Sequence, residues 1–294
     1  MIVVFFHVPK TAGSSINVAA RSALMRGYTV VVEDTHHARL SARLRRLAER
    51  PETYFVQGHI TPSLDLLSIP MRRVTVLRQP LERLLSHFCY CFDRRHYDLN
   101  QLNFFRSRKN YSSNIFDGED LIAWVTRFNM DNFQVRFLTA EYNGKITDRS
   151  LARAITILSS FDCVATTDRL TVFFKFLGEF VQRDFEVDKL PHTNRSDRSR
   201  LRLSREDQEY IAKEFCQKDQ ELVQVAMDRD DQLDRPSVRY REQIEKTAFR
   251  EPGSILQLLS TNTTMHEVFI KAKRRSLGIA AQTIEILGKL APKG

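Results

Sequence analysis

Residues 1–15, MIVVFFHVPKTAGSS, decide the fold of this chain. The run Ile2–Phe6 consists of β-branched and aromatic residues, which is typical of a strand buried inside a parallel sheet. A loop rich in hydroxyl groups follows at once, and from Ile16 to about Met25 the pattern is helical. The sequence therefore predicts a strand, a tight loop and a helix in direct succession.

A loop of this kind can bind an anion such as a phosphate group. Its backbone N–H groups and the positive end of the helix dipole face one point. Lys10 adds a positive charge, and Gly13 lets the backbone come close to a ligand. Hydroxyl donors are also present, on Thr11, Ser14 and Ser15. The segment is not a Walker A motif, because there the lysine follows the last glycine. The alternative is an ordinary turn with a capping serine and a surface lysine.

A second strand-to-helix junction lies further along the chain. Met71–Leu77 is a predicted strand, and Pro80 suits the first turn of the helix that follows. The apolar face of that helix has i, i+3, i+4, i+7 spacing: Leu81, Leu84, Leu85 and Phe88. Arg78, at the end of the strand, can bind a phosphate through its planar guanidinium group. For Arg83 we expect a structural pairing with Glu82 or another neighbour.

Together the two segments resemble the carbohydrate sulfotransferases related to heparan sulfate 2-O- and 6-O-sulfotransferases. Residues 7–15 are similar to the family's 5′-phosphosulfate loop, and residues 76–88 to its 3′-phosphate segment. The family usually has Asp where this chain has Gln79. The residues that keep the family register are Arg78, Pro80, Glu82, Arg83 and Ser86. The resemblance covers roughly residues 1–225 and loosens between the two segments.

The resemblance implies an α/β fold with a central parallel sheet flanked by helices, P-loop-like in topology. It implies transfer of a sulfuryl group from 3′-phosphoadenylyl sulfate (PAPS) to a hydroxyl of a carbohydrate or glycolipid. We expect no metal, because fixed hydrogen-bond donors can supply the electrostatic stabilisation. The implied cosubstrate residues are Lys10, Thr11, Ala12, Gly13, Ser14, Ser15, Arg78, Ser86, Asn194 and Arg195. The last two lie in residues 190–196, which resemble the loop that closes over the nucleotide in these enzymes.

The predicted catalytic residues are Lys10 and His59. Residues 54–60, YFVQGHI, are a predicted strand whose end carries His59, and ligands of open α/β sheets bind outside the carboxyl ends of strands. The 2-O-sulfotransferases have a Gly-His at the corresponding point, where the histidine is their proposed general base. A neutral imidazole can take the proton of an acceptor hydroxyl. A histidine that only caps a strand end is the alternative. Gln57 stands where some relatives have a second histidine. Arg136 is our candidate for acceptor binding.

Composition narrows the partners and the location. The 294 residues carry a formal charge of +9, which suits a nucleotide, an acidic glycan, a membrane surface or a nucleic acid without selecting one. We expect a glycan or glycolipid acceptor and no nucleic acid.

The cysteines at 89, 91, 163 and 216 have neither disulfide-framework nor zinc-site spacing. No signal peptide or membrane span is recognisable, so we expect a cytoplasmic enzyme of bacterial type, whereas animal relatives are Golgi membrane proteins.

We expect a sulfotransferase domain at residues 1–230 and a helical C-terminal extension at 231–294. Within the extension, residues 265–290 form a predicted amphipathic helix. We favour packing of this helix on the chain's own body or on a twin subunit in a homodimer, and the alternative is peripheral membrane contact. Residues 93–120 are polar, aromatic and irregular, and two alternatives stay open: a segment that lines an acceptor groove or acts as a lid, or a solvated loop. Residues 204–227 are predicted to form one capped helix.

Two other functions remain open. A nucleotide-dependent small-molecule kinase would need an Asp at a strand end to hold Mg²⁺, and Arg78 occupies a natural place for it. A non-catalytic polyanion-binding protein would show salt-dependent affinity and no preference for a 3′-phosphorylated nucleotide.

Overall fold

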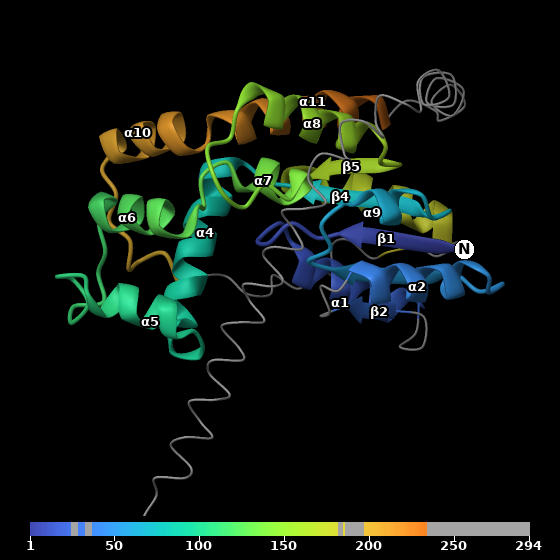
Figure 1. Ribbon diagram of the computed structural model, residues 1–294, viewed down its shortest axis with the longest axis horizontal. Helices are drawn as coiled ribbons and strands as arrows, with labels where there is room; N and C mark the ends of the chain where they lie inside the picture. The colour runs from blue at the N-terminus through green and yellow to red at the C-terminus, as the bar shows by residue number, and fades with distance from the viewer. Residues whose placement is uncertain (25–28, 33–36, 182–184, 186–196, 234–294) are drawn as a thin grey trace, which may run out of the picture. The chain divides into compact units, whose positions relative to one another are not determined.

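The computed structural model describes residues 1–24, 29–32, 37–181, 185 and 197–233. Five parallel strands form one sheet in the order β2-β3-β1-β4-β5. Their bounds are β1 Ile2–Phe6, β2 Thr29–Val32, β3 Tyr54–Gly58, β4 Arg72–Leu77 and β5 Cys163–Thr166. Strand β1 lies at the centre between β3 and β4, and all five of its residues are buried (Figure 1). The predicted α/β class with a central parallel sheet is therefore confirmed.

Helices connect the successive strands, and further helices follow β5. The α-helices are α1 Gly13–Leu24, α2 His37–Ala48, α3 Leu64–Leu67, α4 Pro80–Asp93, α5 Leu99–Arg106, α6 Gly118–Phe128, α7 Phe133–Thr139, α8 Asp148–Ser159, α9 Leu170–Val181, α10 Arg205–Phe215 and α11 Gln217–Leu233. Two short 3₁₀ helices, η1 and η2, span Arg95–Tyr97 and Thr167–Arg169.

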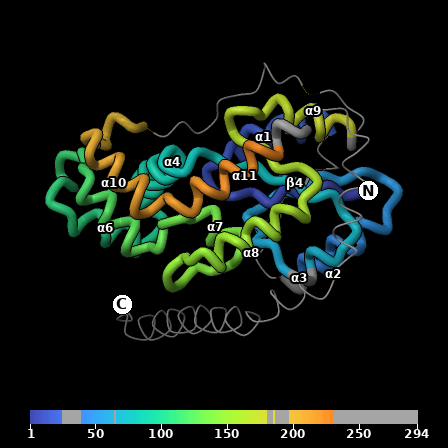
Figure 2. The backbone as a smooth tube through the Cα atoms, turned by 90° about the horizontal axis from the view of Figure 1, so that it is seen from above, coloured from blue at the N-terminus to red at the C-terminus, as the bar shows by residue number. Residues whose placement is uncertain are grey.

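Helices α1 and α9 cover one face of the sheet. Alternate β1 residues, Val3 and Phe5, belong to one apolar cluster with Ile16 of α1 and Phe173 of α9. This alternation is the two-residue period of a strand, which sends neighbouring side chains to opposite faces. Figure 2 shows α1 and α9 on one side of the sheet and α2 and α3 on the other. A sheet covered on both faces explains why β1 is apolar throughout.

The chain order of the strands makes the carboxyl ends of β1 and β4 the point where the connections diverge. The connection that leaves β1 leads to β2 on one side of the sheet, whereas the connection that leaves β4 leads to β5 on the other. Adjacent strands whose connections diverge in this way leave room for a ligand at their carboxyl ends. The segments that begin at His7 and at Arg78 therefore share one edge of the sheet.

A second apolar core lies among α4, α5, α6 and α10, which gather beside the sheet in Figure 1. Trp124 is fully buried there, and Phe88 makes edge-to-face ring contacts with it at 5.5 Å. Phe105 of α5 and Phe116 belong to the same cluster and are fully buried. The expectation that residues 93–120 are irregular was wrong, and so was the solvated-loop alternative, because the segment contains α5 and these two aromatic side chains anchor it in a core. A role in lining an acceptor groove or as a lid stays a prediction.

The helix expected at residues 204–227 is two helices, with a break at Cys216. Helices α7 and α11 cap each other at this point. The side-chain oxygen of Asn132 accepts hydrogen bonds from the N–H groups of Lys218 and Asp219, at 2.8 and 3.2 Å. In return, the Asp219 carboxylate accepts from the N–H groups of Gln134 and Val135, at 3.0 and 2.9 Å. The chain breaks at Cys216 because a new helix, α11, begins there. The side chain of Asn132 is the partner of N–H groups in its first turn, which have none inside the helix.

The predicted C-terminal extension, with its amphipathic helix at 265–290, lies outside the described residues. None of the helices that the structure describes has the length and apolar character needed to cross a membrane. The four cysteines, all of which lie in the described part of the chain, are not joined in disulfides, and three of them are buried.

We predict that Asp219→Ala destabilises the protein strongly. The Asp219 side chain is buried, with the residue 2% exposed, and its loss leaves the N–H groups of Gln134 and Val135 without partners and the buried Arg83 without a nearby carboxylate. The free energy of unfolding should fall by about 3 kcal/mol, measured by urea denaturation at pH 7. Glu209→Ala, at the exposed ion pair with Arg205, is the control and should change little. Equal losses in both variants would contradict the capping role.

Candidate functional site at the carboxyl ends of β1 and β4

The loop between β1 and α1 has an unusual backbone. Lys10 and Ala12 have positive φ angles of 72° and 65°, a conformation that non-glycine residues rarely adopt. Thr11 lies between them, and its hydroxyl donates a hydrogen bond to the Val8 carbonyl at 2.7 Å. Alternating left- and right-handed residues turn successive N–H groups to one side and form an anion-binding concavity. The first turn of α1 adds N–H groups that have no partner inside the helix.

Thr11 does not have the role expected of its side chain. It is fully buried, and the Val8 carbonyl already takes its hydroxyl proton. Its hydroxyl therefore holds the loop in shape and is no donor for a ligand. Ser14, at the start of α1, is exposed, and Ser15 is half-buried. These two hydroxyls remain candidates for contact with an anion.

Gly13 is required by the imidazole of His7. A Cβ atom at position 13 would lie 2.0 Å from Cε1 and from Nε2 of His7. The ring of His7 is stacked on Phe5, with 5.4 Å between centroids, and its buried Nε2 has no hydrogen-bond partner among the described residues. Burial, with the nearby charges of His59 and Lys10, lowers the pKa of His7 to about 3. His7 is therefore neutral at physiological pH and supports the loop from beneath.

Gln57, which stands where some sulfotransferases have a second histidine, also supports this loop. Its side chain is buried and donates to the Gly13 carbonyl through Nε2 at 3.1 Å. A structural hydrogen bond therefore takes the place of an ionisable group at that point.

Arg78 links the two strand ends directly. Its guanidinium Nη1 donates a hydrogen bond to the Lys10 carbonyl at 3.3 Å. Its backbone is held by Gln134 of α7, which accepts from the Arg78 N–H at 3.0 Å and donates to the Arg78 carbonyl at 2.8 Å. The two segments that the sequence marked as phosphate-binding are thus in contact, and a helix from elsewhere in the chain fixes one of them.

One face of α4 forms a wall of the site. Glu82, Ser86 and Tyr90 follow each other at i+4 spacing and so lie on the same side of the helix. The Arg78 Nη2 atom lies 3.5 Å from the Glu82 carboxylate, and the Lys10 ammonium lies 4.2 Å from the centroid of the Tyr90 ring. Ser86, only 6% exposed, lies between these two points on the helix. The predicted residues Lys10, Arg78 and Ser86 therefore lie along the same face of α4.

Arg198 joins this cluster, and the sequence analysis missed it. Its guanidinium lies 2.8 Å from the Glu82 carboxylate and also donates to the Glu82 carbonyl at 3.3 Å. The hydrogen bond from Arg198, together with the charge of Arg78, lowers the pKa of Glu82. Burial and repulsion from Arg198 lower the pKa of Arg78. The one signal in the sequence was that Arg198 closely follows Asn194 and Arg195, which lie outside the described residues.

His59 lies at the carboxyl end of β3, beside the same loop. Its ring centroid is 4.8 Å from that of His7. Although His59 is exposed, enough protein surrounds its ring for desolvation to lower its pKa below the ordinary value of 6.5. At neutral pH His59 is therefore an uncharged imidazole that can accept a proton.

Arg136 does not lie in a position to bind an acceptor. It is 2% exposed, and its guanidinium donates to the Asp131 carboxylate at 2.7 Å and to the carbonyls of Glu141 and Gly144, both at 2.9 Å. Its role is to hold the loop after α7, so the structure argues against the predicted acceptor contact. Arg83, which we expected to be structural, is fully buried and contacts Nδ1 of His87 at 3.2 Å.

Comparisons with protein-family models and with curated proteins give no match to this chain. The part of the chain that the structure describes contains no group of three or more His, Cys, Asp or Glu residues arranged to hold a metal ion. The candidate site therefore has to be interpreted from its own geometry.

We predict that Gly13→Ala destabilises the loop through a steric conflict with His7. The added methyl group would meet the imidazole at 2.0 Å, and overpacking of this kind typically costs about 1–3 kcal/mol. The measurement is the free energy of unfolding of Gly13→Ala, His7→Ala and the double variant. The double variant should lose less than the sum of the two single losses, because His7→Ala vacates the space. Strict additivity would show that the imidazole is not what excludes a side chain at position 13.

Proposed function

We propose that this protein is a PAPS-dependent sulfotransferase that transfers a sulfuryl group to a hydroxyl of a carbohydrate or glycolipid. The observation that carries the proposal is the hydrogen bond from Arg78 to the Lys10 carbonyl. It joins two cationic turns, each at the end of a parallel strand, at the point where the strand connections diverge. A ligand with an anionic group at each end of a nucleoside suits such a paired site. The acceptor class rests on the resemblance of residues 7–15 and 76–88.

The residues that would bind the cosubstrate fall into two groups. The backbone N–H groups of residues 10–15 and the Lys10 ammonium would hold the 5′-phosphosulfate. Arg78 and Ser86 would hold the 3′-phosphate, with Arg198 close enough to Arg78 to contribute. The left-handed backbone at Lys10 and Ala12 supports this fit, because that conformation produces an anion-binding concavity. Asn194 and Arg195 remain predicted contacts.

The chemistry divides between His59 and Lys10. His59 would take the proton from the acceptor hydroxyl while the hydroxyl oxygen forms its bond to sulfur. Lys10 and the loop N–H groups would stabilise the negative charge left on the 5′-phosphate as the old sulfur–oxygen bond breaks. PAPS would supply the sulfuryl group. His59 has the protonation state that this role needs, since its lowered pKa leaves the imidazole neutral at pH 7.

We predict that adenosine 3′,5′-bisphosphate stabilises the protein and that ADP does not do so comparably. At a hundredfold excess over its dissociation constant, a ligand adds about 2.7 kcal/mol, which raises the melting temperature of a domain of this size by several degrees. Arg78→Ala should abolish the difference between the two nucleotides, whereas Arg205→Ala, at an exposed arginine on α10, should preserve it. A preference for ADP or ATP with Mg²⁺ would favour a kinase. Stabilisation by heparin alone would favour a polyanion-binding protein.

We also predict that transfer activity falls in acid with a midpoint below pH 6.5. The neutral imidazole of His59 is the active form, and its pKa is lowered, so activity is full at neutral pH and is lost as the pH falls through that pKa. Radiolabelled sulfate transfer to a panel of glycans, measured from pH 4.5 to 8, tests this.

His59→Ala should reduce turnover by about 10²- to 10⁴-fold and should remove the acid limb. His96→Ala, at an exposed histidine in η1, is the matched control. An unchanged acid limb in His59→Ala would exclude His59 as the base. Lys10→Ala should also reduce turnover by orders of magnitude.

A further inference from the structure

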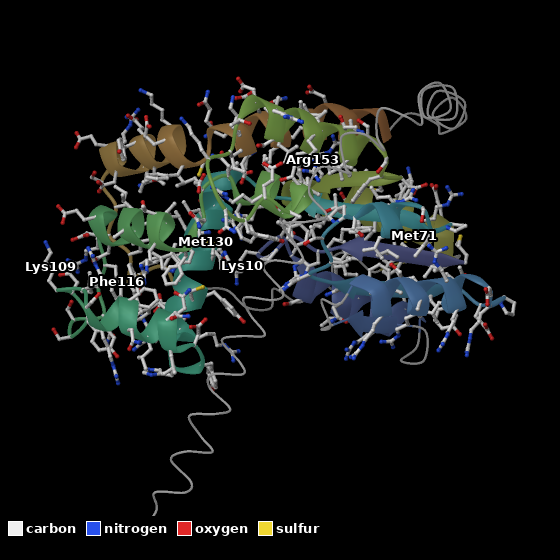
Figure 3. The ribbon with its side chains drawn as sticks, viewed as in Figure 1. Lys10, Met71, Lys109, Phe116, Met130 and Arg153 are labelled. Carbon is white, nitrogen blue, oxygen red and sulfur yellow. The ribbon has the colours of Figure 1, made fainter. Side chains whose placement is uncertain are left out.

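The ammonium group of Lys10 lies against an aromatic ring. Its Nζ is 4.2 Å from the centroid of the Tyr90 ring, within the range of a cation–π interaction. Among the described residues we find no hydrogen bond or ion pair of this ammonium. Figure 3 labels Lys10 at the end of β1 that faces α4. The aromatic ring is therefore the contact that fixes where the end of this side chain lies.

Tyr90 lies where a positioning residue for the site is expected. It is one turn beyond Ser86 on the same face of α4, and it is 40% exposed. The backbone end of Lys10 is already held, because its carbonyl accepts a hydrogen bond from Arg78. Lys10 is thus fixed at both ends, by a guanidinium at its carbonyl and by a ring at its ammonium.

We propose that Tyr90 is a positioning residue that holds the Lys10 ammonium charged and in place on this face of α4, ready for an anionic ligand. A ring face attracts the cation without taking a hydrogen bond from it, so the N–H groups of the ammonium stay available. The inference depends on the proposed function only for the identity of that ligand. An exposed tyrosine that merely covers α4 would leave Lys10 unaffected.

The net effect of the surroundings of Lys10 is to disfavour its positive charge. Burial, the largest effect, and the charge of Arg78 lower the pKa of Lys10, whereas the Asp93 carboxylate opposes this shift. The titratable groups around it are His7, Arg78, His87, Cys89, Cys91 and Asp93. Burial raises the pKa of the Cys91 thiol to about 12, and the thiol is therefore neutral at pH 7. The ring of Tyr90 is thus a close neutral group that favours the charged lysine.

The first test measures the pKa of Lys10 without any ligand. The ¹³Cε signal of Lys10 is followed against pH in ¹³C-lysine-labelled protein, with Lys10→Arg used to assign it. The pKa should be lower in Tyr90→Leu than in the native protein, and Tyr90→Phe should restore it, because a phenyl ring keeps the interaction. Tyr97→Leu is the matched control, since Tyr97 is an exposed tyrosine that contacts Arg94.

The second test measures the dissociation constant of adenosine 3′,5′-bisphosphate. Tyr90→Leu should weaken binding by about 2- to 30-fold, the range of a cation–π contact, and Tyr90→Phe should restore it. Tyr90→Gln is a second variant without the ring. If its melting temperature equals that of the native protein, weaker binding in this variant cannot be due to loss of the fold. An unchanged Lys10 pKa in Tyr90→Leu and Tyr90→Gln overturns the inference. If the native protein does not bind the nucleotide, the proposed function fails, and the titration still decides the role of Tyr90.

Discussion

The contact on which the site depends is the one between Arg78 and the loop that precedes α1. Arg78 donates to the Lys10 carbonyl, while Gln134 holds both backbone groups of Arg78. Gln134 is held in turn by the Asp219 carboxylate at the start of α7. A residue near the end of the described chain is thereby linked, through Gln134 and Arg78, to the loop that follows β1. Each of these hydrogen bonds joins a side chain to a backbone group. Their geometry therefore depends on where the fold places the backbone as well as on the side chains involved.

The same loop is held in a conformation that costs free energy. Left-handed backbone at Lys10 and Ala12 costs about 1–2 kcal/mol per residue, and such strain persists only where the surroundings enforce it. Two hydrogen bonds hold the loop in this conformation. The Thr11 hydroxyl donates to the Val8 carbonyl, and the Gln57 side chain donates to the Gly13 carbonyl. His7 fits beneath Gly13 as a buried neutral imidazole, which is costly to protonate. The buried contacts and the glycine at position 13 thus hold the loop in its strained conformation. That conformation is the one expected to turn successive N–H groups to one side.

The sequence predicted the parts of this arrangement that depend on local pattern. The strand Ile2–Phe6, the loop with Gly13 and the place of Arg78 and His59 at strand ends follow from periodicity and from the rule for parallel sheets. It could not predict contacts between distant residues. Asn132 and Asp219 split one expected helix into two, and Phe105 and Phe116 draw a polar segment into a core. As an arginine, Arg136 has the chemistry of a residue that binds an acceptor. Only the structure shows that it is buried and that its guanidinium donates to groups of the protein itself.

The charges of the site support the proposal that it binds an anion. Arg78 and Arg198 share a single carboxylate, that of Glu82, and their mutual repulsion together with burial lowers the pKa of Arg78. The Lys10 ammonium rests on a neutral ring. Asp93 and Asp168 favour the charges of Lys10 and Arg78 respectively, but among the described residues neither carboxylate forms an ion pair with them. A doubly phosphorylated nucleotide would add the missing negative charge at both ends of the α4 face, and it would relieve repulsion that the fold alone has to bear. Part of its binding free energy would then come from relief of the repulsion that destabilises the protein without the ligand. Functional sites commonly reduce the stability of the folded protein in this way.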